Sequence, residues 1–217
     1  MTLLPSGAIY LSDLGLLLVA DAHFGKAVSF RLQGVPVPQG TTTETLQRLT
    51  DALAQTHAKH IMFLGDFLHS AEAHAAPTQL AISRWRNEHP ALQLTLIRGN
   101  HDDRAGDPPL SLGMQVVDVP FVLSGGAMPL ALCHHPQRVA GSYVLAGHAH
   151  PCVVLRGAGK ERLRVACFVL GHSTTRAVGV LPAFGSFTGM QPIVRHRTDR
   201  VFAVAGTAVR ELPRTST

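Results

Sequence analysis

The stretch Leu92–Asp103, LQLTLIRGNHDD, changes character at a single glycine. Apolar residues dominate up to Ile97, and after Gly99 an amide, an imidazole and two carboxylates follow without a spacer. A short apolar run that ends in such a polar turn is typical of a buried strand that delivers a functional loop. The stretch therefore predicts a strand with candidate functional groups at its carboxyl end.

Three other apolar runs end in the same way. They are Leu14–Ala20 before Asp21, His60–Leu64 before Gly65 and Asp66, and Ser142–Ala146 before Gly147 and His148. Their lengths suit buried strands of a parallel sheet.

Two segments between these runs have helical periodicity. In residues 41–57, Leu46, Leu49 and Leu53 mark one helix face, and Thr41 and Glu44 stand at capping-box spacing. Residues 77–89, PTQLAISRWRNEH, begin with a proline suited to a helix start. Alternating strands and helices predict an α/β fold with a parallel sheet in the first half.

The second half of the chain has a different hydrophobic pattern. After Gly113, short apolar runs are separated by turn residues, which predicts mostly strands with short connections. No linker or internal repeat divides the 217 residues, so we expect a single domain over residues 1–217 in which two sheets pack together.

Composition narrows the class of protein. The formal net charge is +5 and there are 13 histidines, an excess of the commonest metal ligand. A basic chain favours anionic partners such as nucleic acid or phosphorylated substrates. The three cysteines sit in apolar runs, and the N-terminus has no secretory signal or spanning segment, so we expect reduced thiols, a cytoplasmic location and no membrane partner.

Polar side chains gather where the apolar runs end. They form the blocks DAH (21–23), GDFLH (65–69), GNHD (99–102), CHH (133–135) and GHAH (147–150). In open α/β sheets ligands bind at the carboxyl ends of strands, so residues far apart in sequence converge there. DAH and GD alone are common turn chemistry. GHAH is a stronger signal, because an extended segment would present His148 and His150 to the same side. All five blocks in order predict one site.

These blocks resemble the signature of the calcineurin-like metallophosphoesterase superfamily over residues 21–150. The resemblance implies an α/β fold of four layers, an αββα sandwich in which helices flank two mixed sheets and the active site lies at strand carboxyl ends. It also implies two divalent metal ions. Asp21, His23, Asp66 and His150 would hold one ion, and Asp66, Asn100, His134 and His148 would hold the other, with Asp66 bridging.

The ligand types fit a phosphodiesterase. Carboxylate, imidazole and amide donors without a thiolate suit Mn²⁺ first, with Fe or Zn²⁺ as alternatives. Paired ions generate a bound hydroxide near neutral pH, which would attack the phosphodiester. His134 and His135 are adjacent in a strand and point oppositely, so one of them is expected to bind metal, and we choose His134.

Three further residues are assigned catalytic roles by the resemblance. His101 would face the phosphate and stabilise charge or protonate the leaving oxygen. Asp102 would orient His101 or, alternatively, cap the next turn. His69 stands where protein phosphatases have an aspartate followed by Arg-Gly; here Ser70 follows, which indicates the phosphodiesterase and nuclease branches.

Residues 21–49 and 181–190 resemble a narrower group, the bacterial ligase-associated DNA damage response endonucleases. That group implies a manganese-dependent DNA endonuclease in DNA repair that favours single-stranded or looped DNA, with an ATP-dependent DNA ligase and a helicase as functional partners. Lys26, Arg31 and Arg104 are candidate substrate contacts. Phe184 and Phe187 are candidates either for stacking on a base or for packing in the core.

Two other functions are weighed against this one. The first is a phosphodiesterase acting on a small molecule or cyclic nucleotide. The second is a scaffold without metals, which the full set of ligands disfavours. The apolar strands near the end of the chain are also candidates for a homodimer interface.

Overall fold

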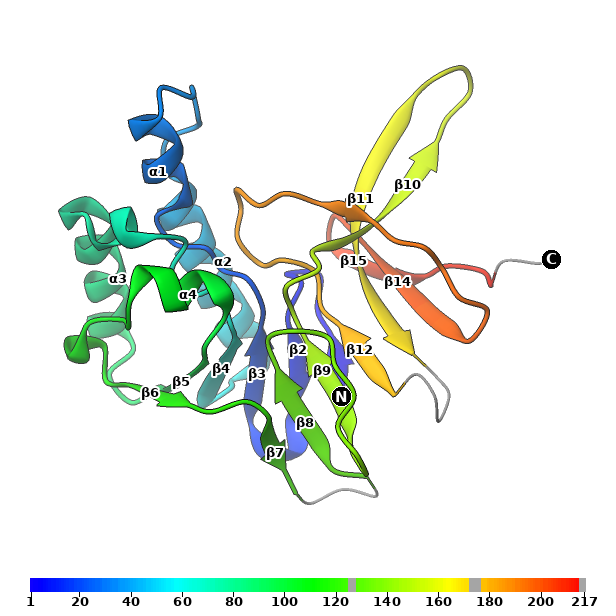
Figure 1. The fold of residues 1–217 in the computed structure, drawn as a ribbon, viewed down its shortest axis with the longest axis horizontal. Coiled ribbons are helices and arrows are strands. Elements are labelled where there is room, and N and C mark those ends of the chain that lie inside the picture. Colours follow the sequence, from blue (N-terminus) through cyan, green and yellow to red (C-terminus); the bar gives the residue numbers. More distant parts are fainter. Residues whose placement is uncertain (125–127, 172–176, 215–217) are drawn as a thin grey trace.

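The computed structural model describes residues 1–124, 128–171 and 177–214. Two β-sheets pack face to face, and helices cover the far side of the first sheet (Figure 1). The predicted α/β class with two mixed sheets is confirmed. The predicted outer helical layer on the second sheet is not seen, because no described residue after Gly113 lies in a helix.

The first sheet has six strands in the order of the chain. They are β1 (Thr2–Leu3), β2 (Ile9–Leu11), β3 (Leu16–Val19), β4 (His60–Leu64), β5 (Gln93–Ile97) and β6 (Met114–Val117). The pairs from β3 to β6 are parallel, and β1 and β2 form an antiparallel edge. The predicted parallel sheet is confirmed.

Strand β6 corrects the boundary between the two halves. The change of hydrophobic pattern after Gly113 suggested that the second sheet begins there, yet Met114–Val117 pairs with β5 in the first sheet. The strand is only half-buried, because it lies at the edge of the sheet. A half-buried edge strand lacks the continuous apolar run of the central parallel strands, so its sequence resembles that of the second half.

The second sheet has nine strands. They are β7 (Phe121–Leu123), β8 (Leu130–Cys133), β9 (Tyr143–Ala146), β10 (Pro151–Arg156), β11 (Arg162–Gly171), β12 (Val178–Val180), β13 (Gln191–Pro192), β14 (Asp199–Ala205) and β15 (Ala208–Glu211). The main order is β13-β10-β11-β12-β9-β8-β7, with β14 joined to β11 and to β15. Parallel pairs β8–β9 and β9–β12 sit beside antiparallel pairs, so the sheet is mixed.

The helices come from connections in the first half. They are α1 (Lys26–Leu32), α2 (Thr41–Thr56), α3 (Ala76–Glu88) and α4 (Asn100–Ala105), with 3₁₀ turns at Ser12–Leu14, Ala71–His74 and Leu110–Leu112. The predicted capping box on α2 is wrong. Gly40 is the N-cap residue and Thr41 is already helical, and the cap residue has φ 82°, which glycine adopts without strain.

Two apolar cores hold the layers together. Leu49 of α2 and Trp85 of α3 pack with Phe63 beneath the helical layer. On the other face of the first sheet, Met62 packs between the sheets with Phe168. The cysteines Cys133, Cys152 and Cys167 are buried and free, and none of the described helices is long and apolar enough to span a membrane.

Candidate metal centre

The backbone is in the left-handed region at most of the predicted ligands. Among described residues other than glycine, six have positive φ, and five of these are Asp21, His23, Asp66, His148 and His150, with φ between 45° and 66°. This conformation costs L-residues free energy and persists where surrounding structure fixes it, commonly at functional sites. The ends of β3, β4 and β9 are thus bent to aim these side chains at one point.

GHAH, residues 147–150, is one of these turns. The sequence predicted an extended segment that presents His148 and His150 to the same side, and this is wrong because both residues have positive φ. The two imidazoles nevertheless reach the centre, each in a different group of donors.

The first group of donors lies between the ends of β3 and β9. His23 Nε2 is 3.2 Å from His150 Nε2 and 3.6 Å from an Asp66 oxygen, and His150 Nε2 is 3.6 Å from Asp21 Oδ1. Asp21, His23 and Asp66 are buried. These are the four residues predicted to bind the first metal.

The second group is centred on His134. Its Nε2 is 3.0 Å from Asn100 Oδ1, 3.1 Å from His148 Nδ1 and 3.4 Å from Asp66 Oδ1. Asp66 faces the first group with Oδ2 and this group with Oδ1. The carboxylate therefore stands between the two groups, as a bridging ligand does.

Backbone carbonyls orient two of the imidazoles. His134 Nδ1 donates to the carbonyl of Leu64 at 2.9 Å, and His150 Nδ1 donates to that of Gly189 at 3.1 Å. Each ring thus keeps the lone pair of Nε2 for the centre, the usual arrangement of histidine metal ligands. Sequence reasoning missed Leu64 and Gly189, because a backbone carbonyl leaves no residue-type signal.

The donor set fits divalent metal ions. Ligands about 2.0–2.2 Å from an ion lie roughly 3 Å apart at right angles, close to the separations seen here. Burial lowers the pKa of His23 far below its usual range, and burial followed by the nearby His134 lowers that of His148. Neutral imidazoles are the form that binds metal.

His134 and His135 follow the end of β8 and differ in burial, but the expected opposite orientation is wrong, because their ring centroids lie 4.8 Å apart and both rings belong to a possible ligand group with His148. His134 is 1% exposed and lies inside the second group, whereas His135 is exposed and its ring is 4.1 Å from that of His148. The structure places His134 at the centre and His135 at its rim. A Cβ on Gly65 would collide with His134, and a Cβ on Gly99 would collide first with Asp66 and then with His134, so glycine is required at both positions.

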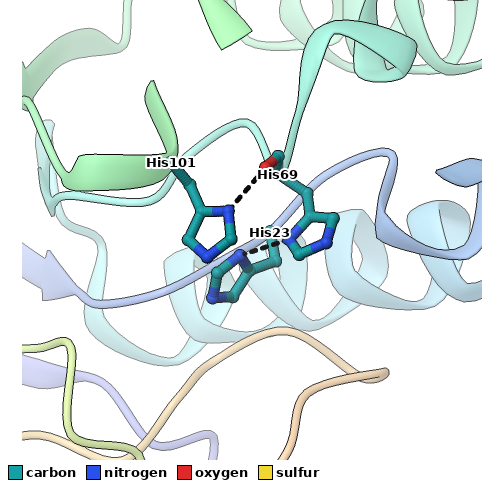
Figure 2. A group of neighbouring side chains, drawn as sticks. All are labelled: His23, His69 and His101. Atoms are coloured by element: carbon teal, nitrogen blue, oxygen red, sulfur yellow. Dashed lines mark hydrogen bonds between the residues drawn. The ribbon is translucent and has the colours of Figure 1, made fainter. Parts of the chain in front are cut away.

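His23, His69 and His101 form a cluster beside the first group (Figure 2). The rings of His69 and His101 are stacked with centroids 4.5 Å apart, and His69 Nδ1 is 3.1 Å from His23 Nδ1. His101 Nδ1 donates to the carbonyl of His69 at 2.6 Å, which fixes its ring. Burial, then the proximity of His101, lowers the pKa of His69 to about 4.

Asp102 takes the second of the two roles left open by the sequence. Its buried carboxylate accepts the N–H groups of Gly99 at 2.9 Å and Leu68 at 2.8 Å, and it caps α4. Orientation of His101 by Asp102 is therefore wrong, since the His69 carbonyl holds that ring. Burial raises the pKa of Asp102 to about 6.

The candidate substrate contacts lie at different distances from the centre. Lys26 lines a recess with His23 and Thr41, and burial lowers its pKa while Asp66 and Asp21 oppose that shift. Arg31 is exposed and donates to the carbonyl of Pro38, and Arg104 is exposed on α4. Of the three, Lys26 is the cation next to the metal centre.

The two candidates for stacking on a base, Phe184 and Phe187, differ in burial. Phe184 is 0% exposed in the core, so base stacking is wrong for it. Phe187 is half-buried and contacts Phe30 edge to face, with centroids 5.6 Å apart.

Comparison with solved structures finds a strong relative. The structure of Pseudomonas putida nuclease MPE has a sequence 44% identical to this one. The match covers 96% of this chain and 93% of that chain, with a TM-score of 0.82. The phosphoesterase Yfce from E. coli is 14% identical in sequence, and the match covers 92% of this chain and 99% of that chain, with a TM-score of 0.49. No curated protein matches.

The profile of the family described as Calcineurin-like phosphoesterase matches residues 14–164. This range contains every predicted metal ligand and both groups of donors. The chain is a hydrolase of phosphoester bonds and belongs to the calcineurin-like phosphoesterase family.

Proposed function

We propose that this protein is a phosphodiesterase with two divalent metal ions that acts as a DNA endonuclease and favours single-stranded or looped DNA. The observation that carries the proposal is the pair of donor groups joined by Asp66. The similarity to a solved nuclease at 44% identity over 96% of the chain supports nucleic acid as the substrate.

The residues that would hold the ions are those of the two donor groups. Asp21, His23 and His150 would hold one ion, Asn100, His134 and His148 would hold the other, and Asp66 lies between the two groups. Mn²⁺ is the first choice, with Fe and Zn²⁺ as alternatives, because the donors are oxygen and imidazole nitrogen. Bound paired ions supply an activated water and neutralise charge on the phosphate.

His69 and His101 are placed to meet the phosphate. His101 Nδ1 donates to a carbonyl, so its Nε2 remains available to exchange a proton with the leaving oxygen. His23 must keep its Nε2 lone pair for metal, so its Nδ1–H donates to His69 Nδ1. The neutral His69 then carries its hydrogen on Nε2 and can donate it to a phosphate oxygen.

The surroundings of the centre favour a polymer over a small ligand. His135, His148 and Ala149 are exposed at its rim, and Lys26 lines a recess beside His23. A small-molecule site normally encloses most of its ligand, whereas a nuclease site must admit a continuous strand. The formal charge of +5 supports an anionic polymer.

The wider role rests on the narrower resemblance of residues 21–49 and 181–190. We propose a cytoplasmic DNA-repair enzyme that works with an ATP-dependent DNA ligase and a helicase. Exposed Leu155 and Leu163 are candidates for a homodimer contact. Pull-down of the purified protein with the ligase and helicase encoded in the same genome, and light scattering of the protein alone, test these two proposals.

The function is tested with circular single-stranded DNA and Mn²⁺. Wild-type protein is expected to linearise the circle, and Asn100→Ala and His148→Ala are expected to lose this activity. Asn87→Ala, an exposed asparagine on α3, is the matched control and should cut like wild type. If the two site variants cut as well as the control, the assigned centre is wrong.

The alternative is a phosphodiesterase for a small molecule or cyclic nucleotide. The same preparations are therefore given a cyclic nucleotide and a dinucleotide. Hydrolysis of the cyclic nucleotide while circular DNA stays intact would replace the endonuclease proposal with this one.

A further inference from the structure

A β-hairpin projects from the fold beside the metal centre. Strands β10 and β11 extend beyond the sheets in Figure 1, joined by residues 157–161. β10 begins at Pro151, directly after His150 of the first donor group. Arg156 lies six residues beyond His150 along an extended strand, so the arm reaches roughly 20 Å from the centre.

The two faces of this hairpin carry different side chains. Residues directly opposite in an antiparallel pair lie on the same face. Arg156 pairs with Arg162, and Arg164 pairs with Val154, so three guanidinium groups share one face. On the other face Leu155 pairs with Leu163 and Val153 pairs with Val165.

The basic face lies on the side of the second sheet that faces the first sheet. Along β11, Arg162 and Arg164 share a face with Phe168, which packs between the sheets. Arg164 Nη1 donates to the carbonyl of Met190 at 3.2 Å, and the neighbouring Gly189 carbonyl accepts from His150. The basic face is thus connected to the loop that borders the metal centre.

The cations of this face are not neutralised within the part of the chain that the structure describes. Arg156, Lys160 and Arg162 are exposed, and none is within ion-pair distance of a described carboxylate. Glu161 is the one acid in the arm, and its Oε2 lies close to Gly157. A row of unpaired cations complements the evenly spaced charges of a phosphate backbone.

We propose that the basic face of the β10–β11 hairpin binds the phosphate backbone of the nucleic-acid strand on one side of the bond that is cut. This inference rests on the proposed nuclease function. A dinucleotide bound at the metal centre is too short to reach Arg156, so the arm acts on long substrates alone.

The test compares Arg156→Gln/Arg162→Gln with Lys59→Gln/Arg210→Gln. The control removes the same charge from exposed positions away from the basic face: Lys59 precedes β4 at the far end of the first sheet, and Arg210 pairs with Ala203 on the opposite face of the second. With Mn²⁺, kcat/KM is measured for a dinucleotide and for a single strand of about 30 nucleotides over a series of salt concentrations.

Loss of two phosphate contacts should reduce kcat/KM for the long strand roughly 10–30-fold at about 0.1 M salt. The slope of log(kcat/KM) against log salt concentration should become shallower by about 1.4. The dinucleotide should be cut at the wild-type rate. The control should behave like wild type on both substrates.

Each other outcome overturns the proposal. Equal loss on both substrates would mean that the arginines support the metal centre, and no loss beyond the control would mean that the arm does not touch DNA. A wild-type protein that cuts the dinucleotide but neither cuts nor binds the long strand would overturn the nuclease function together with this inference.

Discussion

The loops of the two sheets bring different chemistry to the same centre. Those of the first sheet supply both carboxylates and the amide, from Asp21, Asp66 and Asn100, together with His23. Those of the second sheet supply imidazoles alone, from His134, His148 and His150. The first sheet therefore sets the charge of the centre, and the second completes the coordination with neutral donors.

Asp66→Asn breaks this division most directly. It keeps the size of the side chain but removes the charge shared by both groups, so hydrolysis of a bis(4-nitrophenyl) phosphate substrate should fall by about 10²–10³-fold or more, the range for losing an electrostatic stabiliser. Metal content by plasma mass spectrometry should fall with it. Asp107→Asn, which removes an exposed ion pair to Arg98, is the control and should leave both readings unchanged. Full activity of the Asp66 variant would refute the bridging role.

Comparing His134→Ala with His135→Ala tests which of these two adjacent histidines binds metal. The His134 variant should bind metal at least about 100-fold more weakly, because it loses a buried neutral donor and the contact to Leu64. The His135 variant should stay within a few-fold of wild type, since that ring lies at the rim. Isothermal titration with Mn²⁺ checks both, and circular dichroism confirms that each variant is folded. A reversed order would exchange the two assignments.

Leu49→Ala tests the helical layer that covers only the first sheet. Leu49 is 0% exposed between α2 and the sheet, so its truncation should lower the free energy of unfolding by about 2–5 kcal/mol. The matched control is Leu80→Ala on α3, where the side chain is 52% exposed; it should lower the free energy of unfolding by about 0.5 kcal/mol or less. Urea denaturation followed by circular dichroism measures both values. Similar losses for the two variants would show that the layer is not packed as described.

Cys167 tests the outer face of the second sheet, where Ile193 and Leu212 pack against a buried cluster. The residue is 0% exposed among Val153, Val201 and Ala203, and burial raises the pKa of its thiol to about 12. At pH 8 about one thiol in 10⁴ is then ionised, so iodoacetamide should leave it unlabelled in the folded protein and label it in urea. Mass spectrometry of the peptide gives the result. Rapid labelling without urea would show that this face is open.

The hydrophobic pattern predicted the central strands and helices closely. The expected strand at residues 60–64 is β4, and the helix expected at residues 41–57 is α2, which ends one residue earlier. These elements are buried on both faces or on one regular face, so local periodicity carries their signal. The edge strand β6 and the cap at Gly40 were missed, because edge burial and cap geometry depend on neighbours that are distant in sequence.

The sequence by itself determined which residue types could form the centre, because the five polar blocks each follow a glycine or an apolar run. The resemblance also predicted how the ligands divide between two ions. Only the tertiary structure decided their directions: Asp66 faces the two groups with different oxygens, His134 is buried while His135 is exposed beside it, and Asp102 caps α4 and does not hold His101. The reason is physical. Residue type fixes what an atom can donate or accept, whereas direction depends on left-handed turns and on carbonyls such as those of Leu64 and Gly189, which other strands and loops bring into place.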